Sequence, residues 1–149
     1  RNMVLYIAKK DSPQPIRLMS SVGKQLPLYC TGLGRALLAY KSEEEIRSLF
    51  PEVLTAYTPH TIATINDLLK ELELTRQRGY AVEHEETNLM VNCIAVSLDY
   101  NNAPIAALSI SIPTFRISES KEKEAVQILW EAKQHIETHF KMYGVDFGN

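Results

Sequence analysis

The chain has 149 residues, of which 45% are hydrophobic, and a formal net charge of -2 at pH 7. This size and apolar fraction fit one globular domain, spanning residues 1–149, with a core of its own. The charges are balanced and no run of five or more like charges occurs, which excludes strong unaided binding to nucleic acid. The sequence shows no signal peptide or membrane-spanning stretch, so we expect a cytoplasmic protein without a membrane partner.

The N-terminal part contains two short β-prone runs, residues 3–8 and 16–19. The segment between them is rich in Pro and Asp and predicts a turn, so the two runs are expected to form an antiparallel pair. The first run starts almost at once, without a leader. We therefore expect an excised domain whose N-terminal partner is missing.

Residues 26–39, LPLYCTGLGRALLA, combine a glycine-lined turn with an apolar helix that is expected to begin at Gly34 or Arg35 and to be buried. Gly32 and Gly34 have no Cβ, so backbone N–H groups can approach a ligand closely. The first turn of the helix adds unpaired donors and the positive end of its dipole, which suits a small anion. The alternative is a turn that only packs, because neither the Rossmann fingerprint nor a lysine-bearing phosphate loop is present.

Two more helices follow, each with recognisable ends. Ser42 and Glu45 form a capping-box pattern for a short, peripheral helix that stops before Pro51. Thr64 precedes a second helix, and Gly79 stands where its C-terminal cap belongs.

Strands are predicted at residues 80–83, 93–99 and 105–112, the last two as a hairpin at the centre of the sheet. A long amphipathic helix is expected to begin near residues 118–119 and to cover the sheet. Its apolar stripe, interrupted by Lys133, comprises Val126, Leu129, Ile136, Phe140 and Tyr143. Helices mixed with antiparallel hairpins predict an α+β architecture.

The strand over residues 105–112 carries two hydroxyls on one face. Period two places Ser109 and Ser111 with Ala107, opposite an apolar face that contains Leu108 and Ile110. Hydroxyls buried without partners are costly, so these two either bond neighbouring backbone or face a cavity. Both interpretations remain open.

Glu83 ends a predicted strand and is followed by Glu85 and Glu86. These carboxylates form either a solvated acidic loop or, at Glu83, an acceptor for ligand hydroxyl groups. Cys93 begins the next strand, where its thiol either fills the core or contacts a ligand.

Metal binding and catalysis have little support in the sequence. His135 and His139 lie four apart, but no Glu or third ligand completes a zinc-site pattern, so we expect no metal or cofactor. No His is tied to Cys30 or Cys93, and Gly-x-Ser-x-Gly is absent, so no catalytic residues are predicted. A thiol-dependent hydrolase and a pure dimerisation module are the alternative functions.

Four segments together resemble the C-terminal effector-binding domain of the IclR family of bacterial transcriptional regulators, over nearly the whole chain. They are LPLYCTGLGRA at residues 26–36, YTPHTI at 57–62, RQRGY at 76–80 with the acidic pair at 85–86, and CIA at 93–95 with ALSIS at 107–111. The resemblance implies a GAF-like domain with a curved antiparallel sheet that holds a small organic acid. It also implies a homodimer or dimer of dimers, and DNA contact only through an N-terminal winged-helix domain that this chain lacks.

The resemblance further implies which residues contact the effector. Ligand contacts map onto the backbone amides of Gly32 and Leu33 and the side chains of Glu83, Cys93, Ser109 and Ser111, and the apolar lining maps onto Leu18, Leu26 and Val91. An ionised Glu83 would repel a ligand carboxylate, so it is placed at the opposite end of a hydroxylated or keto acid. Family members that govern sugar-acid use share similar segments, which favours an aldonate or 2-keto sugar acid.

Three positions depart from the family pattern. Glu83 stands where Asp is usual, Met90 replaces a glycine, and Asn92 replaces a basic residue. The extra methylene of Glu83 is expected to reshape the pocket, and the departures together are expected to affect the choice of effector, but not the fold.

Overall fold

The computed structural model describes residues 2–13 and 21–148, and the helices and strands mix as expected for an α+β fold. In chain order the elements are β1 (Met3–Leu5), β2 (Gln25–Pro27), α1 (Gly32–Leu38), α2 (Glu43–Leu49), α3 (Ile65–Arg78), β3 (Ala81–His84), β4 (Val91–Tyr100), β5 (Ala103–Pro113), a 3₁₀ turn (Thr114–Arg116) and α4 (Glu119–Tyr143).

The main sheet is antiparallel, in the order β3-β4-β5. The predicted hairpin of β4 and β5 is present, but only β4 is central, since β5 has no second neighbour among the described strands. β1 pairs with β2 in a separate antiparallel ribbon. The partner predicted for the first strand, residues 16–19, lies outside the described residues.

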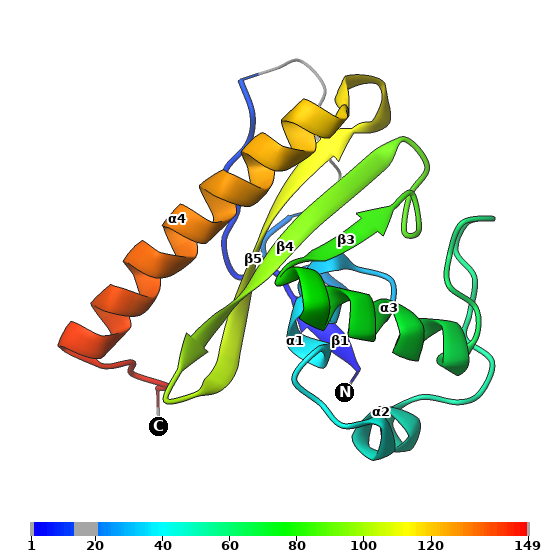
Figure 1. Ribbon diagram of the computed structural model, residues 1–149, viewed down its shortest axis with the longest axis horizontal. Coiled ribbons are helices and arrows are strands. Elements are labelled where there is room, and N and C mark those ends of the chain that lie inside the picture. Colours follow the sequence, from blue (N-terminus) through cyan, green and yellow to red (C-terminus); the bar gives the residue numbers. More distant parts are fainter. Residues whose placement is uncertain (1, 14–20, 149) are drawn as a thin grey trace.

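The two faces of the sheet are covered by different helices (Figure 1). α4 packs on one face, where Val126 and Leu129 join Ile94 and Val96 in a buried apolar cluster. Leu108 and Ile110 lie against that cluster, as the period-two pattern predicts. Because side chains alternate along a strand, Ser109 and Ser111 belong to the other face, against which α1 packs.

The start of α1 differs from the prediction. The helix begins at Gly32, not at Gly34 or Arg35, because the hydroxyl of Thr31 accepts the Gly34 N–H at 3.1 Å and caps the first turn. Both glycines are therefore inside the helix. A Cβ on Gly34 would lie 2.1 Å from the carbonyl oxygen of Leu28, so this glycine permits a close backbone approach.

The other helix ends agree with the sequence. Ser42 and Glu45 form the predicted capping box of α2, and Thr64 caps α3. Gly79 ends α3 with φ of 81°, a conformation that glycine adopts without strain. Ser118 caps α4, which runs from one end of the sheet to the other (Figure 1).

Lys133 interrupts the apolar stripe of α4 because it serves a polar cluster at the end of β4. Its ammonium group donates to the Asp99 carboxylate at 2.9 Å and to Glu137 at 2.6 Å. It also donates to the backbone carbonyl of Ser97 at 2.8 Å. Lys133 therefore links α4 to β4 through its ion pair with Asp99 and its hydrogen bond to Ser97 instead of apolar contact.

Two of the three departures from the family pattern lie away from the α1-covered face. Met90 is exposed and has φ of 68°, a backbone conformation that glycine adopts more readily. Asn92 lies on the α4-covered face, where its side-chain amide donates to Thr114 and its amide oxygen bonds His84. Neither side chain therefore lies under α1.

Candidate functional site

A row of three polar side chains crosses the α1-covered face of the sheet. Glu83 on β3 is opposite Cys93 on β4, and Cys93 is opposite Ser111 on β5. The Cys93 Sγ and the Ser111 Oγ are 3.1 Å apart. Gly32 lies directly above this row, since a Cβ there would be 3.4 Å from the Cβ atoms of Cys93 and Ala95. The fold thus brings together residues that are up to 79 positions apart in the sequence, from Gly32 to Ser111.

The remaining predicted residues surround this row less closely. Ser109 is opposite Ala95 on the same face, and Leu33 packs against a small buried cluster that includes Ala95. Leu26 in β2 and Val91 at the start of β4 are half-buried. The third expected lining residue, Leu18, lies outside the described residues.

The N-terminus of α1 lies above the row and begins with backbone donors that the helix itself does not use. Thr31 accepts the N–H groups of Gly34 and Arg35, through its hydroxyl and its carbonyl respectively. The preceding N–H groups, of Gly32 and Leu33, have no acceptor within the helix, as at any helix start. They are the two amides that the sequence predicts for ligand contact.

Glu83 is a buried carboxyl group with only 1% of its surface exposed. Its Oε1 accepts the backbone N–H of Glu86 at 2.5 Å and that of Thr87 at 3.3 Å. Burial raises the pKa of Glu83 above its ordinary value, partly offset by these hydrogen bonds. The interpretation of this acidic cluster as a solvated loop is therefore wrong at Glu83 and also at Glu86, which is buried as well.

Tyr6 lies near Cys93 and Glu83, a proximity that the sequence did not reveal. Burial, followed by the nearby Cys93 and Glu83, raises the pKa of its hydroxyl to about 12. Burial likewise raises the pKa of the Cys93 thiol to about 12. At neutral pH both groups are protonated and uncharged, so they offer hydrogen bonds but no charge. The position of Tyr6 just beyond a short strand carries no recognisable signal for such a role.

The sulfur atoms lack the partners that nucleophilic catalysis requires. Burial raises the pKa of the Cys30 thiol to about 12, and this thiol faces the Pro27 carbonyl. His84 is the histidine nearest in sequence to Cys93, and it bonds Asn92 on the opposite face of the sheet. Within the described part of the chain, no hydrogen bond joins a histidine to either sulfur, so the geometry does not support a thiol-dependent hydrolase.

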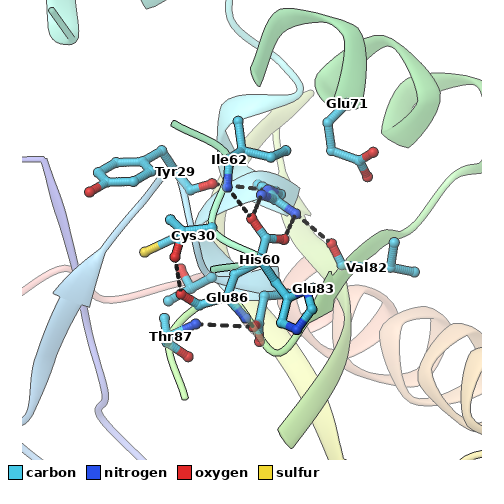
Figure 2. A network of polar contacts seen from close by, with 12 residues as sticks. Tyr29, Cys30, His60, Ile62, Glu71, Val82, Glu83, Glu86 and Thr87 are labelled. Carbon is cyan, nitrogen blue, oxygen red and sulfur yellow. Dashed lines mark hydrogen bonds and ion pairs between the residues drawn. The ribbon is translucent and has the colours of Figure 1, made fainter. Parts of the chain in front are cut away.

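A buried ion pair lies next to the site and was not predicted from the sequence. Arg35, in the helix predicted to be apolar on nearly every side, is 1% exposed and forms a two-pronged pair with Glu86. The two N–O distances are 2.6 and 2.5 Å. Figure 2 shows Glu86 between Ile62 and Val82, next to Glu83. The signal that could have found the pair is an arginine inside an otherwise Ala- and Leu-rich helix, since buried charges are almost always paired.

Two surface cavities lie elsewhere on the molecule. One, of about 620 Å³, lies between β3 and the first half of α4, and its lining includes Tyr80, His84 and Trp130. The other, of about 280 Å³, lies beside Tyr40 and Ser97 at the far end of α1. Neither of these two cavities is lined by the predicted site residues.

The described residues form neither a metal-type cluster nor a membrane-type helix. Within residues 2–13 and 21–148, no three His, Cys, Asp or Glu side chains gather in a way that could hold a metal ion. His139 instead packs its ring on that of Tyr143, with centroids 4.6 Å apart. No helix in those same ranges has the length and apolar content needed to cross a bilayer.

The raised pKa of Glu83 predicts a particular dependence of stability on pH. The folded state holds this proton above pH 4.5, where the unfolded chain has lost it, so stability is full below that value. It then declines as pH rises through the folded-state pKa. Urea unfolding of wild-type and Glu83→Gln proteins from about pH 4 to 8 measures this, and the decline is expected to be smaller in the variant. Parallel curves for the two proteins would contradict the prediction.

The protein is an α+β domain in which the α1-covered face of the sheet carries hydrogen-bonding side chains, those of Glu83, Cys93 and Ser111. This arrangement is typical of a ligand-binding domain, and the described residues lack the thiol–histidine pair of a hydrolase. The chain belongs to the family described as the C-terminal domain of bacterial IclR transcriptional regulators, whose family model matches residues 1–138.

Individual relatives agree with this assignment. The chain is 39% identical to the HTH-type transcriptional regulator KdgR of Dickeya chrysanthemi, over 89% of this chain and 44% of that protein. The crystal structure of the Thermotoga maritima IclR protein superposes with a TM-score of 0.85 at 34% identity, over 97% of this chain and 58% of the other. A double mutant of the inducer-binding domain of the Acinetobacter transcription factor PobR, solved with 3-hydroxybenzoic acid, has a TM-score of 0.79 at 27% identity, over 91% of this chain and 82% of the other. The chain spans about half the length of the curated relatives that it matches.

Proposed function

We propose that this domain binds a small hydroxylated or keto acid and thereby regulates the DNA binding of a cytoplasmic IclR-type transcription factor. The observation that carries the proposal is the row of Glu83, Cys93 and Ser111 beneath Gly32. These groups come from three strands and one helix, and each can exchange hydrogen bonds with a ligand.

The ligand carboxylate is placed against the N–H groups of Gly32 and Leu33. The dipole of α1 favours negative charge there by up to about 2 kcal/mol in a partly buried site. The hydroxyls of Ser109 and Ser111 supply further donors from β5. This arrangement holds an anion with neutral donors, because the guanidinium group of the neighbouring Arg35 is already paired with Glu86.

Glu83 contacts the other end of the ligand. One of its oxygens accepts two backbone N–H groups and the Cys93 thiol also hydrogen-bonds the carboxyl group, which keeps acceptor capacity for a ligand hydroxyl or hydrated carbonyl. Burial favours the protonated acid, which can donate as well as accept a hydrogen bond. The preferred effector is therefore an acid with hydroxyl groups away from its carboxylate, such as an aldonate or a 2-keto sugar acid.

One comparison supports a small acid as the effector class, and a second supports the regulatory role. The PobR inducer-binding domain has a closely similar fold, and the solved complex of its double mutant contains 3-hydroxybenzoic acid, a small hydroxylated carboxylic acid. KdgR is described as an HTH-type transcriptional regulator, which supports the regulatory role. In the full protein, an N-terminal winged-helix domain would read DNA, and the effector would shift the balance between two arrangements of a dimer or dimer of dimers.

Calorimetry and thermal-shift measurements with small acids test the proposal. The panel contains glyoxylate, pyruvate, D-gluconate and 2-keto-D-gluconate. A ligand at one hundred times its Kd is expected to stabilise the domain by about 2.7 kcal/mol. Replacing both Ser109 and Ser111 by Ala removes two donors and is expected to raise Kd at least about tenfold.

Ser97→Ala is the matched control, because Ser97 lies on the same face of the sheet but pairs with Ala107, toward the other end of β5. It is expected to leave Kd unchanged. An acid that binds the double variant as tightly as it binds the wild type would show that the site is elsewhere. If no acid in the panel binds, the remaining alternative of a pure dimerisation module is favoured.

A further inference from the structure

Arg35 connects the two segments that carry the proposed ligand groups. Its Nε donates to the Tyr29 carbonyl at 2.9 Å, just before the turn that leads to Gly32. Its Nη1 donates at 2.9 Å to the carbonyl of Val82, the residue that precedes Glu83. One guanidinium group therefore sets the spacing between the N-terminus of α1 and the strand residue opposite Cys93.

Glu86 binds both Arg35 and Glu83, and so connects α1 to the segment that carries Glu83. Its carboxylate takes both prongs of Arg35 and also accepts the Ile62 N–H at 2.9 Å. Its own backbone N–H donates to the Glu83 carboxylate at 2.5 Å, and its carbonyl accepts from Thr61 at 2.6 Å. The side chain of Glu86 is thus anchored to α1 and to the 57–62 loop, while its backbone holds Glu83 (Figure 2).

Stability alone does not account for this pair. Removing two charges from water costs about as much as their attraction returns, and well-packed apolar residues commonly serve as well or better. A buried ion pair is therefore weak support for a purely stabilising role. What it adds is fixed geometry, because the planar guanidinium fork matches a carboxylate in only a few orientations.

We propose that Arg35 and Glu86 are positioning residues for the effector site, which hold the Glu83 carboxyl group at a set distance from the Gly32 and Leu33 amides. Neither side chain needs to touch the ligand. The inference rests on the proposed function, since it assigns these two residues the task of orienting a ligand contact.

The test uses the double variant Arg35→Met, Glu86→Leu, which replaces the ion pair by apolar side chains and is expected to stay folded. Amide hydrogen exchange reports the link to Glu83 without a ligand, because residue 86 keeps its backbone N–H. We expect exchange at residue 86 to accelerate at least about tenfold, with core amides such as that of Ile94 unchanged. A purely structural role would instead change all amides together.

Arg78→Met, Glu71→Leu is the matched control. Both residues of this pair lie in α3 and are partly buried, and Arg78 also donates to the Tyr80 carbonyl just before β3, but the pair does not contact Glu83. Exchange at residue 86 is expected to stay at its wild-type rate in this variant. For the tightest-binding acid of the panel, Kd is expected to rise at least about tenfold in the first double variant and to be unchanged in the control.

Unchanged exchange at residue 86 in the folded first variant would overturn the inference, and so would faster exchange with unchanged Kd. If that variant does not fold, Arg35→Lys is tested in its place. This substitution keeps the positive charge but removes the planar guanidinium group that binds the carboxylate through two hydrogen bonds. Failure of both to fold would show a structural role and also overturn the inference. If no acid binds the wild type, the proposed function fails, while the exchange measurement still decides whether the pair holds Glu83.

Discussion

The single substitution Glu86→Gln is expected to destabilise the domain by about 3–5 kcal/mol. It leaves Arg35, a 1% exposed cation, without its counter-charge, and the new amide group would direct N–H donors at the guanidinium group. A charge that loses its partner in the interior cannot recover its hydration. Since the whole stability of a domain of this size is about 5–15 kcal/mol, much of the population is expected to unfold at modest urea concentrations.

Urea unfolding monitored by circular dichroism measures this effect. Glu71→Gln is the control, because it removes the same charge from the Arg78 pair, whose side chains are 25% and 17% exposed. Partial exposure lets water screen that pair, so the expected loss is about 1 kcal/mol or less. Equal losses in the two variants would show that the Arg35–Glu86 pair is no more isolated from solvent than the peripheral one.

Gly34→Ala is expected to cost at least about 2–3 kcal/mol, although alanine is the better helix former. A Cβ on residue 34 would lie 2.1, 2.4 and 2.6 Å from the oxygen, Cα and carbonyl carbon of Leu28. All three are backbone atoms and cannot rotate away as a side chain can. The segment before α1 would have to move, and the Thr31 cap and the Arg35 contact with Tyr29 would move with it.

Gly32→Ala is expected to affect ligand binding with little effect on stability, unlike Gly34→Ala. Its Cβ would meet Cys93 and Ala95 at 3.4 Å, a tolerable contact, so stability is expected to stay within about 1 kcal/mol of the wild type. The same methyl group would occupy the space above Cys93, so the Kd of a bound acid is expected to rise at least about tenfold. Thermal unfolding and calorimetry on the two variants check both expectations. A stable Gly34→Ala protein, or unchanged affinity in Gly32→Ala, would contradict them.

Local structure could be predicted from the sequence because short-range patterns determine it. The capping box at Ser42 and the cap at Gly79 depend only on residues within one turn of the helix end. The alternation along residues 105–112 was sufficient to place Ser109 and Ser111 on one face. The sheet and the family could likewise be predicted from segments in order along the chain.

Three features of the structure depended on contacts that were not predicted from local sequence patterns. The start of α1 depended on the Thr31 hydroxyl, and the buried state of Arg35 depended on Glu86, 51 positions later. The fold brought Tyr6 near Cys93 and Glu83, with no signal in the neighbouring sequence.

The sequence by itself determined the α+β class, the capped helices and the face of the sheet that carries the hydroxyls. Only the tertiary structure decided that Gly34 packs on backbone, that Gly32 lies over Cys93, and that Glu83 is buried. The physical reason is the sequence separation over which each kind of interaction acts. Propensity, capping and periodicity act over a few residues, whereas burial, charge pairing and pKa depend on groups brought together from distant parts of the chain.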